Sequence, residues 1–170
     1  QLGPYEPKIF GDNNEEVDFI NLMEFDRLIK DNKYKLIDLA SSTTYRDDGH
    51  IPGAYFAIRA NLSKSLNKIG GANSIILTSP DGKLAEVAAS DEVFLYRDVK
   101  VLKGGTGSWV EKGLPLEKGF SRMADDPNDV WYRPYDFKDG VEGAMKQYLS
   151  WEIDLLNQIK RDGTANFQII

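Results

Sequence analysis

The stretch Gly49-His50-Ile51-Pro52-Gly53-Ala54 is the most informative part of the chain. It lies between two segments of strand character, residues 34–39 and 54–58. A glycine before His50 and the pair Pro52-Gly53 after it are typical of a turn with a restricted backbone conformation. A histidine in such a turn hydrogen-bonds backbone groups, so we expect His50 to hold the loop in place.

Outward from this motif, strand-like and helix-like segments alternate over roughly a hundred residues, which is typical of a parallel sheet covered by helices on both faces. Asn21 is a predicted helix N-cap, and Gly70-Gly71 ends another predicted helix. The predicted strands are residues 17–20, 34–39, 54–58, 74–78 and 99–102, and the predicted helices begin at 21 and span 59–69 and 84–95.

The composition is that of a globular chain of 170 residues, 41% hydrophobic, with a net charge of −6. No apolar run approaches the roughly 18–20 residues needed to cross a bilayer. An acidic chain without a basic stripe repels phosphate backbones. We therefore expect no membrane span and no nucleic-acid partner, and we expect a cytoplasmic location.

The chain has no cysteine and a single histidine, His50. The first absence excludes disulfides, thiolate chemistry and cysteine-based metal sites. One histidine argues against a catalytic zinc site, so we expect neither a metal nor a cofactor.

The two ends differ in composition from the middle. Residues 1–16 are rich in proline, glycine, asparagine and acidic residues and are predicted to form a linker. Residues 120–170 are predicted to form an extension with an amphipathic helix from about Gly140 to Arg161 that packs on the same domain. The apolar arc of this helix is wider than one contact face needs, which indicates a second contact. Gln1 is not an initiator methionine, so we expect a piece of a longer protein.

Residues 17–119 resemble a rhodanese-like domain. The resemblance rests on an ordered set of residues: Asp38 at a strand end, Tyr45, the motif 49–54, Gly104-Gly105, Trp109, Gly113 and Pro115. It departs from the family where Ala40 stands in place of an arginine. The resemblance implies a three-layer α/β/α fold with a mostly parallel five-stranded sheet, plus a C-terminal helical extension. It also implies a structural role for Asp38, Gly49, His50, Pro52, Gly53, Gly104, Gly105 and Trp109.

The C-terminal region is similar to the end of bacterial proteins built from several tandem rhodanese domains. Trp131 to Tyr135 and Tyr148 to Glu152 carry this likeness. It implies the last, degenerate domain of such a protein, with sister rhodanese domains or another protein as partner.

The loop that carries chemistry in active rhodaneses follows a strand that ends in cysteine, and its backbone N–H groups hold an anion. The matching stretch here is Ser79-Pro80-Asp81-Gly82-Lys83-Leu84, with Ser79 in the cysteine position. A serine hydroxyl titrates far above a thiol and cannot become a persulfide. Pro80 removes an N–H, and Asp81 adds negative charge. This loop is therefore predicted to be a vestigial pocket without thiosulfate transfer.

Other chemistries at this loop are weaker hypotheses. A nucleophilic Ser79 needs a base, and His50, the one imidazole, is assigned to the turn. Lys83 leaves open a weak anion site, against a solvated lysine. Dual-specificity phosphatases share the fold, but they need the cysteine and an arginine near the position of Leu84.

The sequence thus leaves three functional hypotheses. The first is a catalytically inactive rhodanese-like module with a structural, docking or regulatory role in a larger thiosulfate sulfurtransferase. The second is a contribution to the sulfurtransferase activity of a multi-domain parent enzyme. The third is a partner-docking module of the kind that binds kinases, which normally uses a basic cluster that this chain lacks.

Overall fold

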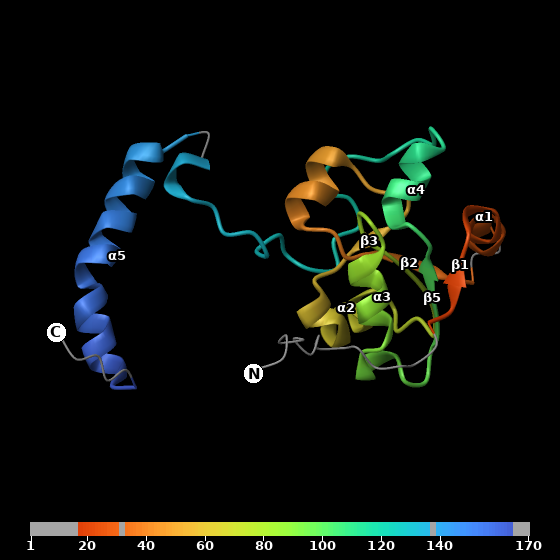
Figure 1. The fold of residues 1–170 in the computed structure, drawn as a ribbon, viewed down its shortest axis with the longest axis horizontal. Coiled ribbons are helices and arrows are strands. Elements are labelled where there is room, and N and C mark those ends of the chain that lie inside the picture. Colours follow the sequence, from red (N-terminus) through yellow and green to blue (C-terminus); the bar gives the residue numbers. More distant parts are fainter. Residues whose placement is uncertain (1–16, 31–32, 137–138, 165–170) are drawn as a thin grey trace, which may run out of the picture. The chain divides into compact units, whose positions relative to one another are not determined.

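The computed structural model describes residues 17–30, 33–136 and 139–164 of the chain (Figure 1). The chain divides into two compact units, one reaching Val130 and the other beginning at Trp131. The expected linker, residues 1–16, lies outside the described residues.

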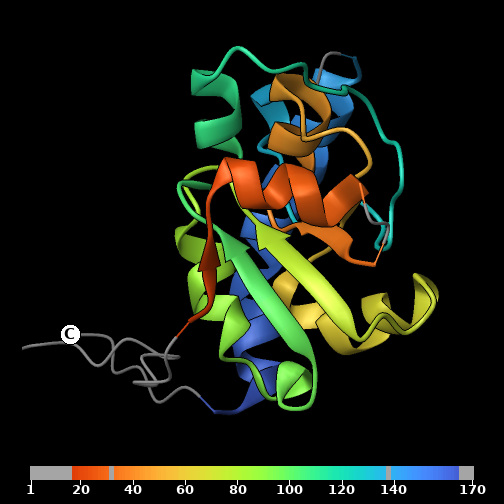
Figure 2. The ribbon, with the colours of Figure 1, turned by 90° about the vertical axis from the view of Figure 1, so that its right-hand side faces the viewer.

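A parallel sheet forms the centre of the first unit. Its strands are β1 (Phe19–Ile20), β2 (Lys35–Asp38), β3 (Tyr55–Phe56), β4 (Ser74–Thr78) and β5 (Asp98–Leu102). Their order is β1-β5-β4-β2-β3, and every pairing is parallel (Figure 2). The predicted five-stranded sheet is confirmed, and β4, with four consecutive buried residues, lies at its centre.

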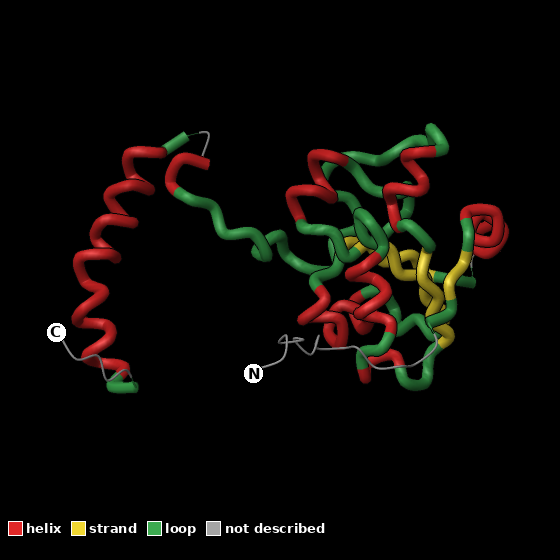
Figure 3. Tube along the Cα trace, viewed as in Figure 1, coloured by secondary structure: helices red, strands yellow, loops and turns green. Residues whose placement is uncertain are grey.

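Helices cover both faces of the sheet, as a parallel sheet requires (Figure 3). The helical elements of this unit are α1 (Leu22–Lys30), η1 (Thr44–Asp48), η2 (Arg59–Asn61), α2 (Leu62–Lys68), α3 (Lys83–Ala89), η3 (Glu92–Phe94) and α4 (Gly105–Glu111). One core cluster joins Ile75 and Leu77 to α2 and α3. The other joins Ile76 to Phe25 of α1 and Trp109 of α4. The alternation of side chains along β4 thus separates the two cores.

Local sequence signals set most helix boundaries. The Asn21 side chain accepts hydrogen bonds from the N–H groups of Met23 and Glu24 at 3.0 Å each, which confirms the predicted N-cap. The single helix expected over 84–95 is instead two elements, α3 and η3. Asp91 between them has extended backbone and binds Arg59 through two hydrogen bonds of 2.9 and 2.6 Å, so the chain leaves the helix there.

Residues 117–129 form a closing segment that returns along the first unit. Glu117 pairs with His50, and Met123 pairs with Phe56 at the free edge of β3. The carboxylate of Asp125, which is buried, accepts hydrogen bonds from the Ile58 N–H at 2.8 Å and the Ser65 hydroxyl at 2.7 Å. The first unit therefore continues to Val130, beyond the expected boundary at residue 119.

The second unit, which we call the arm (residues 131–136 and 139–164), consists of η4 (Pro134–Asp136) and α5 (Val141–Asp162). Arg133 donates to Asp136 through its guanidinium, which fixes the turn before the helix. Gly163, with φ of +67°, ends α5 by donating to the Ile159 carbonyl at 3.1 Å. No residue within α5 is buried, and packing of α5 on the first domain stays a prediction. In the described ranges, no helix has the length and apolar character needed to span a membrane.

Candidate functional site

The loop Ser79–Leu84 lies at the carboxyl end of the central strand. Ser79 follows β4 directly and is fully buried, and Gly82 takes a left-handed conformation, φ +83°, before α3 begins at Lys83. Ligands of open parallel sheets bind beyond the carboxyl ends of the strands. The structure therefore places Ser79–Lys83 at the ligand-binding edge of the sheet, although of these residues only Pro80 lines the cleft described below.

The start of α4 holds the loop from its other side. The Thr106 N–H donates to the Ser79 carbonyl at 3.0 Å, and the Gly107 N–H donates to the Pro80 carbonyl at 2.8 Å. A Cβ on Gly105 would lie 2.0 Å from the Ser79 carbonyl oxygen and 2.4 Å from the Gly82 nitrogen. Glycine at position 105 is thus required by the close approach of the two backbones as well as by its φ of +59°.

Three backbone donors, those of Gly82, Lys83 and Ala85, are engaged within the loop and the first turn of α3. The Gly82 N–H donates to the Ser79 carbonyl at 3.2 Å, and the Ala85 N–H donates to the Ser79 hydroxyl oxygen at 3.3 Å. The Lys83 N–H donates to the Asp81 carboxylate at 3.1 Å, and this bond holds the pKa of Asp81 below its usual value. Pro80 has no N–H to offer. An internal carboxylate and a hydroxyl thus take the amides that a bound anion would use.

The ammonium group of Lys83 is paired with the same carboxylate. Its Nζ lies 3.4 Å from Asp81 Oδ2, and both side chains are well exposed. An exposed pair of this kind contributes little to stability. Lys83 is therefore a solvated lysine whose charge is partly balanced, and the neighbouring Leu84 adds no charge to the loop.

Asp38 ends β2 beneath the loop with a carboxyl group that is almost fully buried. The Ala40 N–H donates to Asp38 Oδ1 at 2.9 Å, and the Thr106 hydroxyl contacts Oδ2 at 3.4 Å. The Thr106 hydroxyl also lies 3.2 Å from that of Thr78. Burial raises the pKa of Asp38 to about 6, although both hydrogen bonds oppose the change.

A cleft of about 460 Å³ opens over this carboxyl end of the sheet. Asp38 and Pro80 both line it, together with residues of η1 and α4. The full lining is Asp38, Ala40, Thr44, Asp48, Gly49, Pro80, Thr106, Gly107, Val110, Glu111 and Leu116. The structure thus brings Asp38, Gly49 and Pro80 of the predicted set into one cavity.

His50 is a structural residue. Its ring is fully buried and stacks on Tyr45 with centroids 3.5 Å apart. Nδ1 lies 2.9 Å from the Tyr45 carbonyl oxygen, which only accepts, and Nε2 lies 2.9 Å from the Ser121 hydroxyl. Both nitrogens are occupied, so His50 provides no base for Ser79.

The other motif residues position backbone rather than bind a ligand. Gly49 has φ of +108°, and a Cβ there would lie 3.0 Å from the Glu117 carbonyl oxygen. Gly53 donates to the Glu117 carboxylate at 3.4 Å, while Pro52 is exposed on the adjoining turn. Trp109 donates to the Pro115 carbonyl at 2.8 Å and packs edge-on against the ring of Phe25. Gly104, with φ of +75°, is the N-cap residue of α4.

Sequence reasoning missed two residues that complete these networks. Thr106 bonds both the loop and Asp38, and its place directly after Gly104-Gly105 was a usable signal for a helix N-terminus. Ser121 contacts His50 across a sequence separation of 71 residues, and no local sequence pattern predicts that contact.

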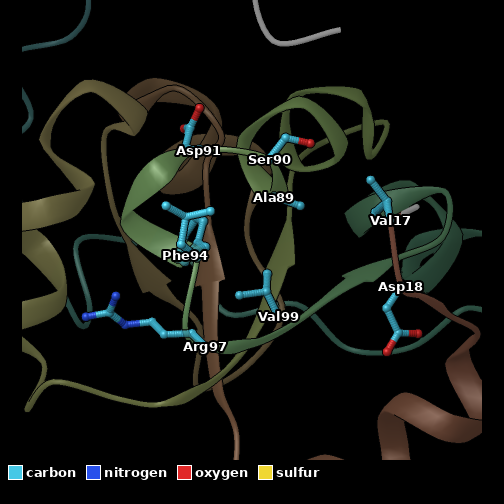
Figure 4. Close-up of a pocket in the computed structure, with 9 residues that line it drawn as sticks. Val17, Asp18, Ala89, Ser90, Asp91, Phe94, Arg97 and Val99 are labelled. Carbon is cyan, nitrogen blue, oxygen red and sulfur yellow. The ribbon is translucent and has the colours of Figure 1, made fainter. Parts of the chain in front are cut away.

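A smaller hollow of about 200 Å³ lies toward the start of β5 (Figure 4), away from the cleft. It is lined by Val17, Asp18, Ala89, Ser90, Asp91, Phe94, Leu95, Arg97 and Val99. Its carboxylates are engaged, since Asp91 binds Arg59 and Asp18 binds Lys100. Among the described residues, no group of three or more histidine or acidic side chains is placed to hold a metal. The cleft therefore remains the candidate site.

The comparisons with known proteins agree with this geometry. Residues 21–112 match the family model described as "Rhodanese-like domain". Among solved structures, the chain is similar to a thiosulfate sulfurtransferase from Pseudomonas aeruginosa, with 33% identity and a TM-score of 0.77 over 93% of this chain. The matched part is 30% of the length of that enzyme. No curated protein matches the chain.

Two other solved structures support the fold alone. A Rhodopseudomonas palustris protein of unknown function, described as a possible tyrosine phosphatase, is 18% identical with a TM-score of 0.56, covering 68% of this chain and 100% of its own. A rhodanese-related protein from Thermoplasma volcanium is 19% identical with a TM-score of 0.51, covering 59% of this chain and 97% of its own.

Replacing Gly105 with alanine is expected to destabilise the first unit by about 3 kcal/mol or more, because the new methyl group meets backbone atoms that cannot move independently. Gly113→Ala is the matched control, since Gly113 also has positive φ, +68°, but has nothing within 4 Å. The control should lose only about 1 kcal/mol. Urea unfolding of both variants measures the difference, and equal losses would refute the close approach.

Asp38→Asn tests the buried carboxyl. Because the folded-state pKa of Asp38, about 6, lies above its unfolded value of 3.8, ionisation of this group alone is expected to remove about 3 kcal/mol of stability from the wild type as pH rises from below 4 to above 7. The variant lacks this titration, so its stability relative to wild type should improve over that range. Urea unfolding across pH measures the effect. Asp48→Asn, an exposed carboxyl of the same cleft, serves as control, and a constant difference between Asp38→Asn and wild type would contradict the pKa.

Proposed function

This chain belongs to the rhodanese-like domain family, and from that premise we propose that it is a catalytically inactive module that docks within a larger thiosulfate sulfurtransferase. The proposed setting is the bacterial cytoplasm, in keeping with the bacterial source of the enzyme matched over 93% of this chain.

The proposed inactivity rests on one observation. Ser79, the residue directly after β4, is buried, and its hydroxyl oxygen accepts a hydrogen bond from the Ala85 N–H. Oxygen at this atom cannot store sulfur as a persulfide. The Asp81 carboxylate, which takes the Lys83 N–H, also opposes the entry of a dianion such as thiosulfate.

The proposed docking role is supported by the arm. Its aromatic residues and α5 enclose a groove of about 720 Å³ lined by Trp131, Tyr132, Pro134, Ala144, Gln147, Tyr148 and Trp151. Large apolar side chains of the arm are exposed: Trp131 at 74%, Ile153 at 80% and Leu156 at 71%. A helix that buries none of its residues lacks the packing that stabilises helices in proteins. Exposed apolar area of this kind marks an interaction surface.

The pattern of structural matches favours one occupant for the arm. The two smaller relatives cover 59% and 68% of this chain, a share that the first unit alone can supply. The sulfurtransferase covers 93%, so the likeness to it includes most of the arm. That enzyme is also more than three times the length of the matched part. We therefore assign the arm to contact with another rhodanese-like module of the same polypeptide.

The second function, a contribution to the sulfurtransferase activity of a parent enzyme, is favoured by the same extensive match. In that case, the module acts by placing sister modules relative to one another. The two proposed functions differ in one respect: only the second expects removal of this module to change turnover by the rest of the polypeptide.

The inactivity is tested by sulfur transfer from thiosulfate to cyanide. The isolated chain should show no rate above buffer, and Ser79→Cys should gain at most a trace, because the loop amides stay engaged and Asp81 remains. Adding Asp81→Gly to Ser79→Cys should increase sulfur uptake by Cys, read by mass spectrometry. Ser90→Cys is the thiol control. Transfer by the unaltered chain would overturn the proposal.

The docking role is tested by hydrogen exchange. Amides of α5 should exchange rapidly in the chain of residues 1–170 and should be protected in the full-length polypeptide. Replacing Trp151 and Ile153 by serine should remove that protection, while Glu142→Gln, an exposed change on the same helix, should not. Protection already complete in 1–170, or absent from both proteins, would refute docking on a sister module.

A further inference from the structure

A further hollow of about 170 Å³, which we call the amino-end pocket, lies at the opposite edge of the sheet from the cleft. Lys35 begins β2 and Tyr55 begins β3, and these two strands are parallel neighbours, so both residues lie where the strands start. Arg122 of the closing segment also lines the pocket. Asp38 is at the other end of β2, so this pocket is separate from the candidate site described above.

The amino-end pocket is basic, although the chain has a net charge of −6. Its lining contains Lys35 and Arg122 and no acidic residue. Within residues 17–30, 33–136 and 139–164, neither cation forms an ion pair. Two carboxylates of the same region are engaged elsewhere, since Glu117 accepts a backbone N–H at 3.4 Å and Asp98 accepts the Tyr34 hydroxyl. The pocket therefore carries two positive charges that no carboxylate of the described chain pairs with.

The ring of Tyr55 brings the two cations to one place. Lys35 Nζ lies 6.0 Å from the ring centroid, and Arg122 Cζ lies 5.7 Å from it. A cation–π contact leaves the N–H groups of the cation available to an acceptor. The Tyr55 hydroxyl has no hydrogen-bond partner among the residues that the structure describes. The pocket lining thus includes an ammonium, a guanidinium and a phenol, all of them donors to an anion.

The backbone at Arg122 is an independent observation. Among the described residues, Arg122 is the one residue other than glycine with a positive φ, +47°. This conformation is unfavourable for a residue with a Cβ, and hydrogen bonds on both sides maintain it. The Phe56 N–H donates to the Arg122 carbonyl at 3.1 Å, and the Tyr45 hydroxyl donates to the Ser121 carbonyl at 2.8 Å. Residues held in such a conformation cluster at functional sites, and this one supplies the second cation of the pocket.

We propose that the amino-end pocket binds a small dianionic oxyanion of the phosphate type, held by the side chains of Lys35 and Arg122. An arginine fork binds such an oxyanion through two parallel N–H groups, and a lysine adds a mobile point charge. The volume lies below the roughly 300 Å³ at which sites for drug-sized ligands begin, so the pocket suits a single oxyanion group rather than a nucleotide. This inference goes beyond the proposed function and depends neither on docking of the arm nor on inactivity of the loop after β4.

The test is an amide chemical-shift titration of the chain of residues 1–170 with inorganic phosphate at pH 7.5, with sodium chloride of equal ionic strength as reference. Phosphate should give saturable shifts at Gly53, Tyr55 and Arg122, and chloride should not. Lys35→Gln should weaken binding about fivefold, as the loss of one partly exposed charge contact implies. Arg122→Asn should do the same, and asparagine tolerates the left-handed backbone at this position.

Lys64→Gln, which removes an exposed lysine of α2 outside the pocket lining, is the matched control and should leave the affinity unchanged. A second titration with a blocked phosphoserine tripeptide separates free phosphate from a phosphorylated side chain as the source of the anion. Lys35→Gln leaves the backbone at Arg122 untouched, so it decides the outcome even where Arg122→Asn alters the fold. Saturable binding of either probe, weakened by Lys35→Gln, supports the proposal. Non-saturating shifts, unchanged affinity in Lys35→Gln, or an equal loss in Lys64→Gln would each overturn it.

Discussion

The structure of the candidate site depends on the contact between the first turn of α4 and the loop after β4. Two N–H groups of α4, those of Thr106 and Gly107, hold the carbonyls of Ser79 and Pro80, and only glycine at position 105 allows the backbones to come this close. The contact links the ends of β4 and β5, fixes the loop over Asp38 and brings Thr106 to the buried carboxyl. Pro80, Thr106 and Gly107, which make this contact, all line the cleft.

The same contact helps to hold the shape of the loop through bonds within the chain. The carbonyls of Ser79 and Pro80 are satisfied by α4, and the amides of Gly82, Lys83 and Ala85 are satisfied by Ser79 and Asp81, so bonds within the chain hold the loop. A loop that is stable without an anion can tolerate acidic residues around it. The acidic cleft and the Asp81 carboxylate thus lie beside one loop whose shape is held by bonds within the chain.

The fold could be predicted from the sequence because the signals that specify it are local. The continuous apolar segment 74–78, the Asn21 N-cap and the glycine-rich motif 49–54 each express a short-range requirement, and the structure contains each of them. The break between α3 and η3 depends on the Arg59–Asp91 pair across 32 residues, and the His50–Ser121 contact spans 71 residues. A single sequence does not show such contacts. Likewise, the position of Ser79 followed from the motif order, whereas the assignment of each loop amide to its acceptor required coordinates.

The central claim is that the amides of Gly82, Lys83 and Ala85 are engaged within the chain and do not bind an anion. Its most direct test follows the amide resonances of Gly82, Lys83 and Ala85 in the unmodified chain while thiosulfate is added, with sodium chloride of equal ionic strength as reference. The account predicts the same small, non-saturating changes with both salts. Saturable shifts of these three amides with thiosulfate alone would show a working anion cradle and contradict the account.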